Sequence, residues 1–305
     1  MYKKFIGLTA LLCTAVFLFT ACGNTVSQNA SSGKDEKVNV VVSFNAMREF
    51  AQAVGKDKVN IVTMIPDGTE PHDFEPKPSD IKSLSNAKIF IYSGFGMEPW
   101  AEKVIKSSGN SNLVAVQASD GSTPIENKDE DEIKEHGKYD PHLWLSLKGA
   151  QNEAKNIKDA LVKVDPSNKS YYEKNFNDFS KELDTLYNEY DGKFKAVKNK
   201  GFVTGHAAFA YFCRDFGLKQ ESVEDVFAEG EPSTKKLTEL IDYCKKNNIK
   251  TVFVEDMVSP KVSNTLASEV GAKVEQIHTI ESKEKDKDYI ECMKENLDMI
   301  YNSLK

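Results

Sequence analysis

The sequence predicts an α/β protein of two lobes, each a mainly parallel four-stranded sheet flanked by helices, joined by one long rigid helix. Three observations lead to this fold class. Short apolar runs alternate with amphipathic segments in the first half of the chain, the alternation returns after residue 200, and a proline-free stretch of helical periodicity separates the two halves. Near-continuous apolar strands separated by helices are typical of parallel sheets that are covered on both faces.

Composition and charge exclude several classes of protein. The chain has 305 residues, of which 40% are hydrophobic and 29% charged, and a formal net charge of −7. It is therefore long enough for two lobes and is neither fibrous nor disordered as a whole. The acidic balance argues against nucleic-acid binding. Beyond residue 21 the sequence has no run of 18 apolar residues, so we expect no membrane-spanning helix in the body of the protein.

The N-terminal residues 1–21 are predicted to be a secretory signal peptide. Lys3 and Lys4 precede an apolar stretch, which ends at small residues directly before Cys22. This order indicates a lipoprotein, with Cys22 as the lipid-carrying N-terminus; a simply secreted chain and an uncleaved anchor are the alternatives. Residues 22–37 are then the lipidated N-terminus and a polar, flexible tether. We expect a body that is held by its lipid on the extracytoplasmic face of the cell membrane.

Residues 38–165 are expected to form the N-terminal lobe. Its strands are predicted at 38–44, 59–65, 87–92 and 113–118, and its helices at 46–54, 79–84, 99–107 and 145–164. The alternation breaks at residues 120–140, which are polar and rich in acids and so predict a long solvated loop.

Residues 166–199 are expected to link the lobes through a helix at 169–198. About 30 helical residues span about 45 Å, the length of a whole lobe.

Residues 200–305 are expected to form the C-terminal lobe. Its strands are predicted at 202–204, 221–226, 251–254 and 273–277, and its helices at 207–216, 234–247, 261–270 and 289–304. Cys213, Cys244 and Cys292 are the cysteines of the two lobes. They fit buried apolar positions, with a Cys244–Cys292 disulfide as the alternative.

Three histidines follow loops or strands of this pattern. His72 and His206 come after predicted strands, and His142 follows the acidic loop. Ligands of open α/β sheets bind beyond the carboxyl ends of the strands, so a shared site between the lobes is a candidate. The histidines are 70 and 64 residues apart, so spacing alone leaves open whether they bind a metal or are unrelated surface or capping residues.

The sequence offers several candidate oxygen ligands for a metal, but it lacks two common enzyme motifs. A carboxylate ligand could come from Glu255, Asp256 or Glu281, which lie near predicted strand ends. The sequence contains neither a Gly-x-Ser-x-Gly elbow nor a His-Glu-x-x-His helix.

The contexts of these histidines resemble solute-binding protein family 9, the cluster A-I metal-binding lipoproteins of bacterial ABC importers, and within it the zinc-uptake proteins. The matching stretches are Gly68 to Pro76, Asp140 to Leu145, Gly205 to Phe209, Gly230 to Ser233, Phe253 to Glu255 and Ser259 to Lys261. The resemblance covers nearly the whole mature chain. It implies a two-lobed fold with a metal site in the cleft.

The resemblance implies a ligand set of His72, His142, His206 and Glu281. Glu255 resembles a strand-end glutamate of the family that lies near the site without binding the metal. Manganese-type relatives have a carboxylate at the third position, where this chain has His206. Three imidazoles and one carboxylate suit tetrahedral Zn²⁺, although other divalent metals also accept such ligands.

The resemblance also implies function and partners. The expected role is capture of Zn²⁺ and its delivery to an ABC permease that is powered by a cytoplasmic ATPase, by a monomer that catalyses no reaction. A manganese or iron solute-binding protein of the same family is the alternative; a zinc hydrolase and a surface adhesin are remoter ones. The acidic loop, which contains His136, either collects zinc or is only a solvated insertion.

Overall fold

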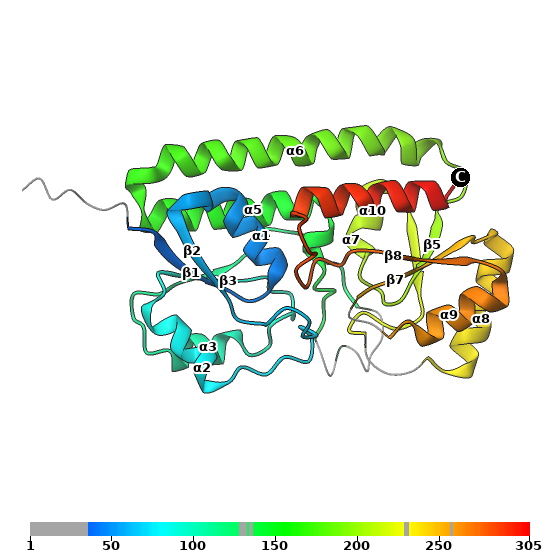
Figure 1. The fold of residues 1–305 in the computed structure, drawn as a ribbon, viewed down its shortest axis with the longest axis horizontal. Coiled ribbons are helices and arrows are strands. Elements are labelled where there is room, and N and C mark those ends of the chain that lie inside the picture. Colours follow the sequence, from blue (N-terminus) through cyan, green and yellow to red (C-terminus); the bar gives the residue numbers. More distant parts are fainter. Residues whose placement is uncertain (1–35, 128–132, 134–136, 229–231, 257–258) are drawn as a thin grey trace, which may run out of the picture. The chain divides into compact units, whose positions relative to one another are not determined.

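The computed structural model describes residues 36–127, 133, 137–228, 232–256 and 259–305 (Figure 1). The predicted signal peptide, Cys22, most of the tether and His136 lie outside the described residues. Among the helices of the described residues, none has both the length and the apolar composition that crossing a membrane requires.

The N-terminal lobe contains a four-stranded parallel sheet with the strand order β2-β1-β3-β4. Its central strands are almost entirely buried, because helices cover both faces. The strands are β1 (Val38–Val42), β2 (Val59–Thr63), β3 (Ile89–Tyr92) and β4 (Val114–Gln117), and the helices are α1 (Asn45–Gly55), α2 (Pro78–Ser83), α3 (Ala101–Ser107) and α5 (Leu147–Val164).

The C-terminal lobe repeats this architecture with the strand order β6-β5-β7-β8, again all parallel. The strands are β5 (Gly201–Thr204), β6 (Lys219–Ser222), β7 (Thr251–Val254) and β8 (Lys273–Gln276), and the helices are α7 (Ala210–Phe216), α8 (Thr234–Asn247), α9 (Pro260–Val270) and α10 (Tyr289–Ser303). The two sheets and the long helix confirm the predicted fold class.

Helix α6 (Lys169–Ala196) packs against α1 and α5 of the first lobe and against α7 and α10 of the second (Figure 1). Its apolar side chains belong to one hydrophobic core that extends into both lobes. Phe179 is one example: its ring centroid lies 6.0 Å from that of Phe50 in α1 and 5.9 Å from that of Tyr289 in α10. Because the lobes share a core, they are joined by packed side chains as well as by the chain itself.

The base of the acidic loop is described, and it forms a short antiparallel ladder. Glu126 and Tyr139 form a bridge, the Asn127 amide donates to the carbonyl of Lys138 at 2.8 Å, and the Asp140 amide donates to the carbonyl of Ile125 at 2.9 Å. These bonds pair Asp140 with the other side of the loop, and the hydroxyl of Tyr211 donates to the Asp140 carbonyl at 2.7 Å, which holds the segment before His142 against the C-terminal lobe.

Two predicted boundaries in the C-terminal lobe are wrong. The helix expected from residue 207 begins at Ala210, because the amide of Ala207 donates to the carbonyl of Asp225 and the amide of Phe209 donates to Oε1 of Gln220. The strand expected at 221–226 is β6, at 219–222. This strand has a polar sequence without an apolar pattern, so its position could not be located from the sequence. Its position is set by pairing with β5 at the edge of the sheet.

The cysteines of the described residues are free thiols. Cys213, Cys244 and Cys292 are all buried, and Cys244 and Cys292 belong to different hydrophobic clusters. The interpretation as buried apolar residues therefore agrees with the structure, and the alternative Cys244–Cys292 disulfide is not formed.

Candidate metal centre

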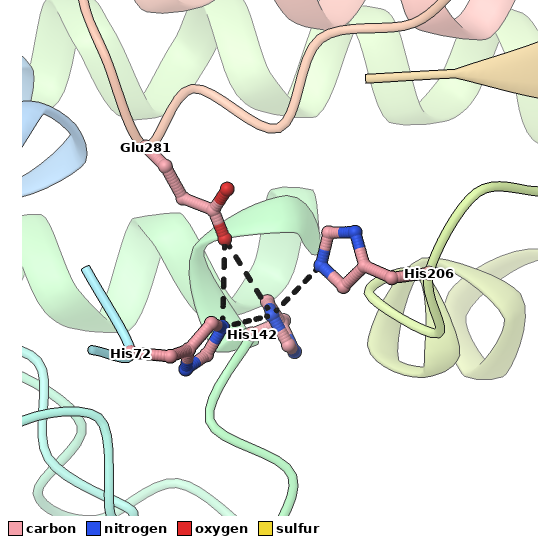
Figure 2. A group of neighbouring side chains, drawn as sticks. All are labelled: His72, His142, His206 and Glu281. Carbon is pink, nitrogen blue, oxygen red and sulfur yellow. Dashed lines mark hydrogen bonds and ion pairs between the residues drawn. The ribbon is translucent and has the colours of Figure 1, made fainter. Parts of the chain in front are cut away.

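Four side chains from distant parts of the sequence meet between the two sheets. His72, His142, His206 and Glu281 each place one ligand atom within 4.8 Å of the others (Figure 2). Of the further carboxylates that the sequence offered, Glu255 and Asp256 are not part of this group. The structure thus brings together the whole set that the resemblance implied.

Three of the four lie in loops that follow strands, and the fourth directly precedes a short helical turn. His72 lies in the loop after β2, His206 lies directly after β5, and Glu281 lies in the loop after β8. His142 directly precedes the short 3-10 helix Leu143–Leu145, which leads into α5. The carboxyl ends of parallel strands meet at one edge of each sheet, and these edges face the same site.

Four of the six distances between the ligand atoms are close to the edges of a tetrahedron around one ion. Nε2 of His142 lies 3.2 Å from Nε2 of His72, 3.4 Å from Nε2 of His206 and 3.6 Å from Oε1 of Glu281. The distance between Nε2 of His72 and the same Glu281 oxygen is 3.8 Å. Four ligands at about 2.0 to 2.2 Å from a central ion lie roughly 3.3 to 3.6 Å apart, so the group has the size of a zinc site.

The site is closed rather than open to solvent. The side chains of His72, His142, His206 and Glu281 are 2%, 0%, 1% and 1% exposed. The expected cleft between the lobes is therefore shut around the ligands. A cavity of about 930 Å³ lies elsewhere, beside the edge strand β6 and the base of the acidic loop.

His142 is oriented by a neighbouring carboxylate. Oδ1 of Asp140 lies 3.0 Å from Nδ1 of His142 and also accepts a hydrogen bond from the His142 amide at 2.9 Å. Burial lowers the pKa of His142, but the hydrogen bond to Asp140 and the nearby carboxylate of Glu281 outweigh it and raise the pKa to about 9. At neutral pH the metal-free His142 is therefore a charged imidazolium, and a bound cation must displace one of its two ring protons.

His206 has an equivalent partner in the C-terminal lobe. Oε1 of Glu255 lies 3.5 Å from Nδ1 of His206 and accepts from its amide at 3.2 Å. Burial lowers the pKa of His206, and the Glu255 carboxylate outweighs this and raises it. A β-carbon at Gly205 would lie 2.0 Å from Oε2 of Glu255, so only glycine allows this approach. Glu255 therefore lies beside the site and not in it, as the resemblance implied.

Glu281 presents one oxygen to the imidazoles. Its Oε2 accepts a hydrogen bond from the hydroxyl of Thr279 at 2.7 Å, whereas Oε1 is buried without a hydrogen-bond partner. Burial raises the pKa of Glu281, but the imidazole of His142, whose Nε2 lies 3.6 Å from Oε1, and the charges of His206 and His72 lower it to about 2. A buried, ionised oxygen without a hydrogen bond, facing three imidazoles, is a typical position for a metal ligand.

Sequence reasoning missed several residues that support the ligands. Asp140 stands two residues before His142, and this Asp-x-His spacing was the signal that could have identified it. Glu70 accepts a hydrogen bond from the amide of His72 at 3.3 Å, and burial together with the Glu281 charge raises its pKa to about 7. No sequence signal pointed to Asn45, whose Nδ2 donates to the carbonyls of Ile280 and Ser282, on either side of Glu281.

Comparison with known proteins gives consistent matches along the chain. The model of the family described as zinc-uptake complex component A, periplasmic, matches residues 40–303. The high-affinity zinc uptake system protein ZnuA of Bacillus subtilis is 40% identical over 317 residues, which cover 100% of this chain and 99% of the relative.

Two solved structures show the same fold. The Zn(II)-bound form of a mutant AdcAII of Streptococcus pneumoniae is 32% identical, has a TM-score of 0.81, and the match covers 88% of this chain and 99% of that chain. The laminin-binding protein Lmb of Streptococcus agalactiae, described as bifunctional with adhesin and metal transporting activity, is 34% identical with a TM-score of 0.81, and the match covers 88% and 100% of the two chains.

Proposed function

The chain belongs to the zinc-uptake complex component A family of solute-binding proteins, and from this premise we propose that it captures Zn²⁺ outside the cytoplasm and delivers it to the permease of an ABC importer. The observation that carries the proposal is the buried group of three imidazoles and one carboxylate, whose ligand atoms all lie within 4.8 Å of one another. The B. subtilis relative is named for high-affinity zinc uptake and the AdcAII structure holds Zn(II).

We propose His72, His142, His206 and Glu281 as the four ligands of the transported ion. Three nitrogens and one carboxylate oxygen suit Zn²⁺, which accepts both kinds of donor in a four-coordinate site. Mn²⁺ prefers oxygen-rich, octahedral sites, so the manganese alternative is less well supported. The protein, in this proposal, recognises the ion by its charge, its size and its preference for imidazole.

The proposed role is binding and not catalysis. A catalytic zinc site keeps one coordination position open for water and places a general base beside it. Here four donors surround one point and their side chains are 0–2% exposed, which leaves no place for a reacting water. We therefore propose that the chain catalyses no reaction and does not act as a zinc hydrolase.

Release must then follow from movement of loops at the site. The shared core under α6 favours small displacements of the lobes over a wide hinge motion. We propose that docking on the permease, which a cytoplasmic ATPase powers, opens one of the ligand loops. The proposed location is the extracytoplasmic face of the cell membrane, where a lipid on Cys22 anchors a monomer.

The test of this proposal is a metal competition. The purified chain, stripped of metal, is exposed to equal concentrations of Zn²⁺, Mn²⁺ and Fe²⁺, and its metal content is measured by mass spectrometry after desalting. We expect about one zinc per chain and a marked loss in His206→Ala. Asn175→Ala, which changes a buried side chain of α6 outside the ligand group, serves as the control and should keep its zinc.

Two results would contradict the proposal. A preference for manganese or iron would mean that the chain carries that metal instead, and the absence of bound metal would contradict a role in metal transport.

Adhesion is a candidate second activity, which the name of the S. agalactiae relative raises. Binding of the full chain to immobilised laminin, with and without Zn²⁺, would test that second activity.

A further inference from the structure

The loop that carries Glu281 belongs to the C-terminal lobe by sequence but is bonded to the N-terminal lobe. Nε1 of Trp144 donates to the carbonyl of Thr279 at 2.8 Å, and the amide of Gly68 donates to Oγ of Ser282 at 2.8 Å. The amide of Asn45 lies 3.4 Å from the carbonyl of Glu281 itself. Both sides of the ligand residue are therefore attached to the first lobe.

Asn45 makes the most direct of these attachments. It is the first residue of α1 and is only 3% exposed. Its Nδ2 donates to the carbonyl of Ile280 at 3.3 Å and to the carbonyl of Ser282 at 3.1 Å. One amide group thus holds the residues immediately before and after Glu281.

The backbone of this loop needs such support. Ile280 has φ +60°, in the left-handed region that a β-branched residue rarely adopts. Such a conformation persists only when surrounding contacts hold it. Because Ile280 directly precedes Glu281, relaxation of its backbone would turn the Glu281 side chain away from the imidazoles.

We propose that Asn45 is a positioning residue for the fourth metal ligand: it holds the loop of residues 280–282 against the first lobe, so that Oε1 of Glu281 faces His72 and His142 before the metal arrives. This inference rests on the proposed zinc-binding role of the four side chains. In this proposal Asn45 acts through Glu281 and is not a ligand itself: its Nδ2 is engaged by the two backbone carbonyls that flank Glu281.

Glu281 and His206 are consequently held by different lobes. The loop that carries Glu281 is bonded to the first lobe, whereas His206 is held by residues of the second. The segment before His142 contacts both lobes, because the hydroxyl of Tyr211 in α7 donates to the carbonyl of Asp140 at 2.7 Å. The carbonyl of His206 accepts from Thr204 at 2.6 Å and from Gln220 at 2.8 Å, and its amide donates to Glu255. A small shift between the lobes would therefore move His206 relative to Glu281, although both residues belong to the C-terminal half of the sequence.

The experiment is a double-mutant cycle on Zn²⁺ affinity, measured by competition with a chelator of known affinity. The four proteins are the wild-type chain, Asn45→Ala, Glu281→Ala and the double variant. We expect Asn45→Ala to weaken Zn²⁺ binding about 10- to 100-fold, the range for residues that orient a ligand. In the Glu281→Ala background the same substitution should change affinity by less than about 2-fold, because the group it positions is gone.

Asn175→Ala provides a matched control. Asn175 is also a buried asparagine, 4% exposed, and its Nδ2 donates to the carbonyl of Val54 at 2.9 Å. It should match Asn45→Ala in loss of stability but not in loss of Zn²⁺ affinity. The visible spectrum of bound Co²⁺ supplies a second readout, which should change in Asn45→Ala as it does in Glu281→Ala and remain as in the wild type in Asn175→Ala.

The outcomes separate the two proposals. If the wild-type chain binds Zn²⁺ and Asn45→Ala binds it equally well, or if the loss is the same in both backgrounds, the positioning role is wrong and the zinc site stands. If the wild-type chain retains no Zn²⁺, the proposed function fails and the inference fails with it. Should Asn45→Ala not fold, Asn45→Ser, which keeps one donor but cannot reach both carbonyls, replaces it in the cycle under the same criteria.

Discussion

The carboxylate of Asp140 lies 3.0 Å from Nδ1 of His142, and this contact decides which nitrogen of the imidazole faces the other ligands. A carboxylate of this kind only accepts hydrogen bonds, so Nδ1 carries the proton and Nε2 remains for a metal. The same Asp140 oxygen accepts from the His142 amide, which fixes the backbone as well as the ring. Ligand and support are thus encoded in three consecutive residues.

The first prediction concerns this pair. Asp140→Asn replaces a carboxylate, which only accepts hydrogen bonds, by an amide that can also donate. The imidazole of His142 then loses its fixed orientation and the negative charge beside Nδ1. Zn²⁺ affinity should fall about 10- to 100-fold in a chelator competition. Asp298→Asn, which changes a carboxylate that is bonded to Tyr190 and Lys294 and takes no part in the ligand group, is the control. Equal affinity in Asp140→Asn and the wild type would show that Asp140 has no role in binding.

The second prediction is the pH dependence of binding. The pKa of His142 in the metal-free chain is about 9 and that of His206 is raised above its ordinary value. Zn²⁺ must displace these protons, so its apparent affinity should weaken as the pH falls below about 9, by about tenfold per pH unit for each proton displaced. Glu281, with a pKa of about 2, remains ionised throughout this range and contributes nothing to the slope.

The measurement is a chelator competition at several pH values, corrected for protonation of the chelator. Asp140→Asn removes a carboxylate that raises the pKa of His142, so its affinity should begin to weaken at a lower pH than that of the wild type. An affinity that stays constant between about pH 7.5 and 5 would be incompatible with a ligand set of three histidines.

Much of the fold could be predicted from the sequence because buried elements have clear patterns. The strand 251–254 and the helix 234–247 were located at their observed ends, since a run of β-branched and aromatic residues and a 3.6-residue period are local signals. The polar edge strand β6 has no such pattern. Its position depends on pairing with β5, which is a property of the folded chain.

The site divides in the same way. The three histidines could be singled out by their positions after predicted strands or loops. Glu281 was one of three candidate carboxylates, and the resemblance was needed to choose it. The contribution of Asn45 could not be predicted, because its partners lie 235 and 237 residues further along the chain and are backbone carbonyls. Contacts between a side chain and a distant backbone leave no residue-type signature in a single sequence.

The third prediction tests whether the thiols are free. Cys213, Cys244 and Cys292 are buried, and burial raises the pKa of Cys292 to about 12 and that of Cys244 to about 11. Since the thiolate is the reactive form, all three should react slowly with a thiol reagent in the folded protein. In denaturant without reductant, the three should react fully, as measured by mass spectrometry of labelled peptides. Unlabelled Cys244 and Cys292 peptides joined to each other would indicate a disulfide instead.

The last prediction follows from the core that both lobes share. Phe179 of α6 packs against Phe50 of the first lobe and Tyr289 of the second, and is 6% exposed. Phe179→Ala should lower the free energy of unfolding by about 3–5 kcal/mol, the usual range for a buried phenylalanine. Because the same side chain supports both lobes, they should still unfold together in one transition, followed by fluorescence and circular dichroism in urea. Val62→Ala, at a residue that is 46% exposed, should change the free energy of unfolding by less than about 0.5 kcal/mol.

The number of unfolding transitions separates two views of helix α6. Two transitions in the wild type, with only one of them affected by Phe179→Ala, would mean that the lobes fold independently and that α6 only connects them. A single transition would mean that the lobes form one cooperative unit. That result would support loop movement, rather than independent motion of the lobes, as the route by which the ion leaves.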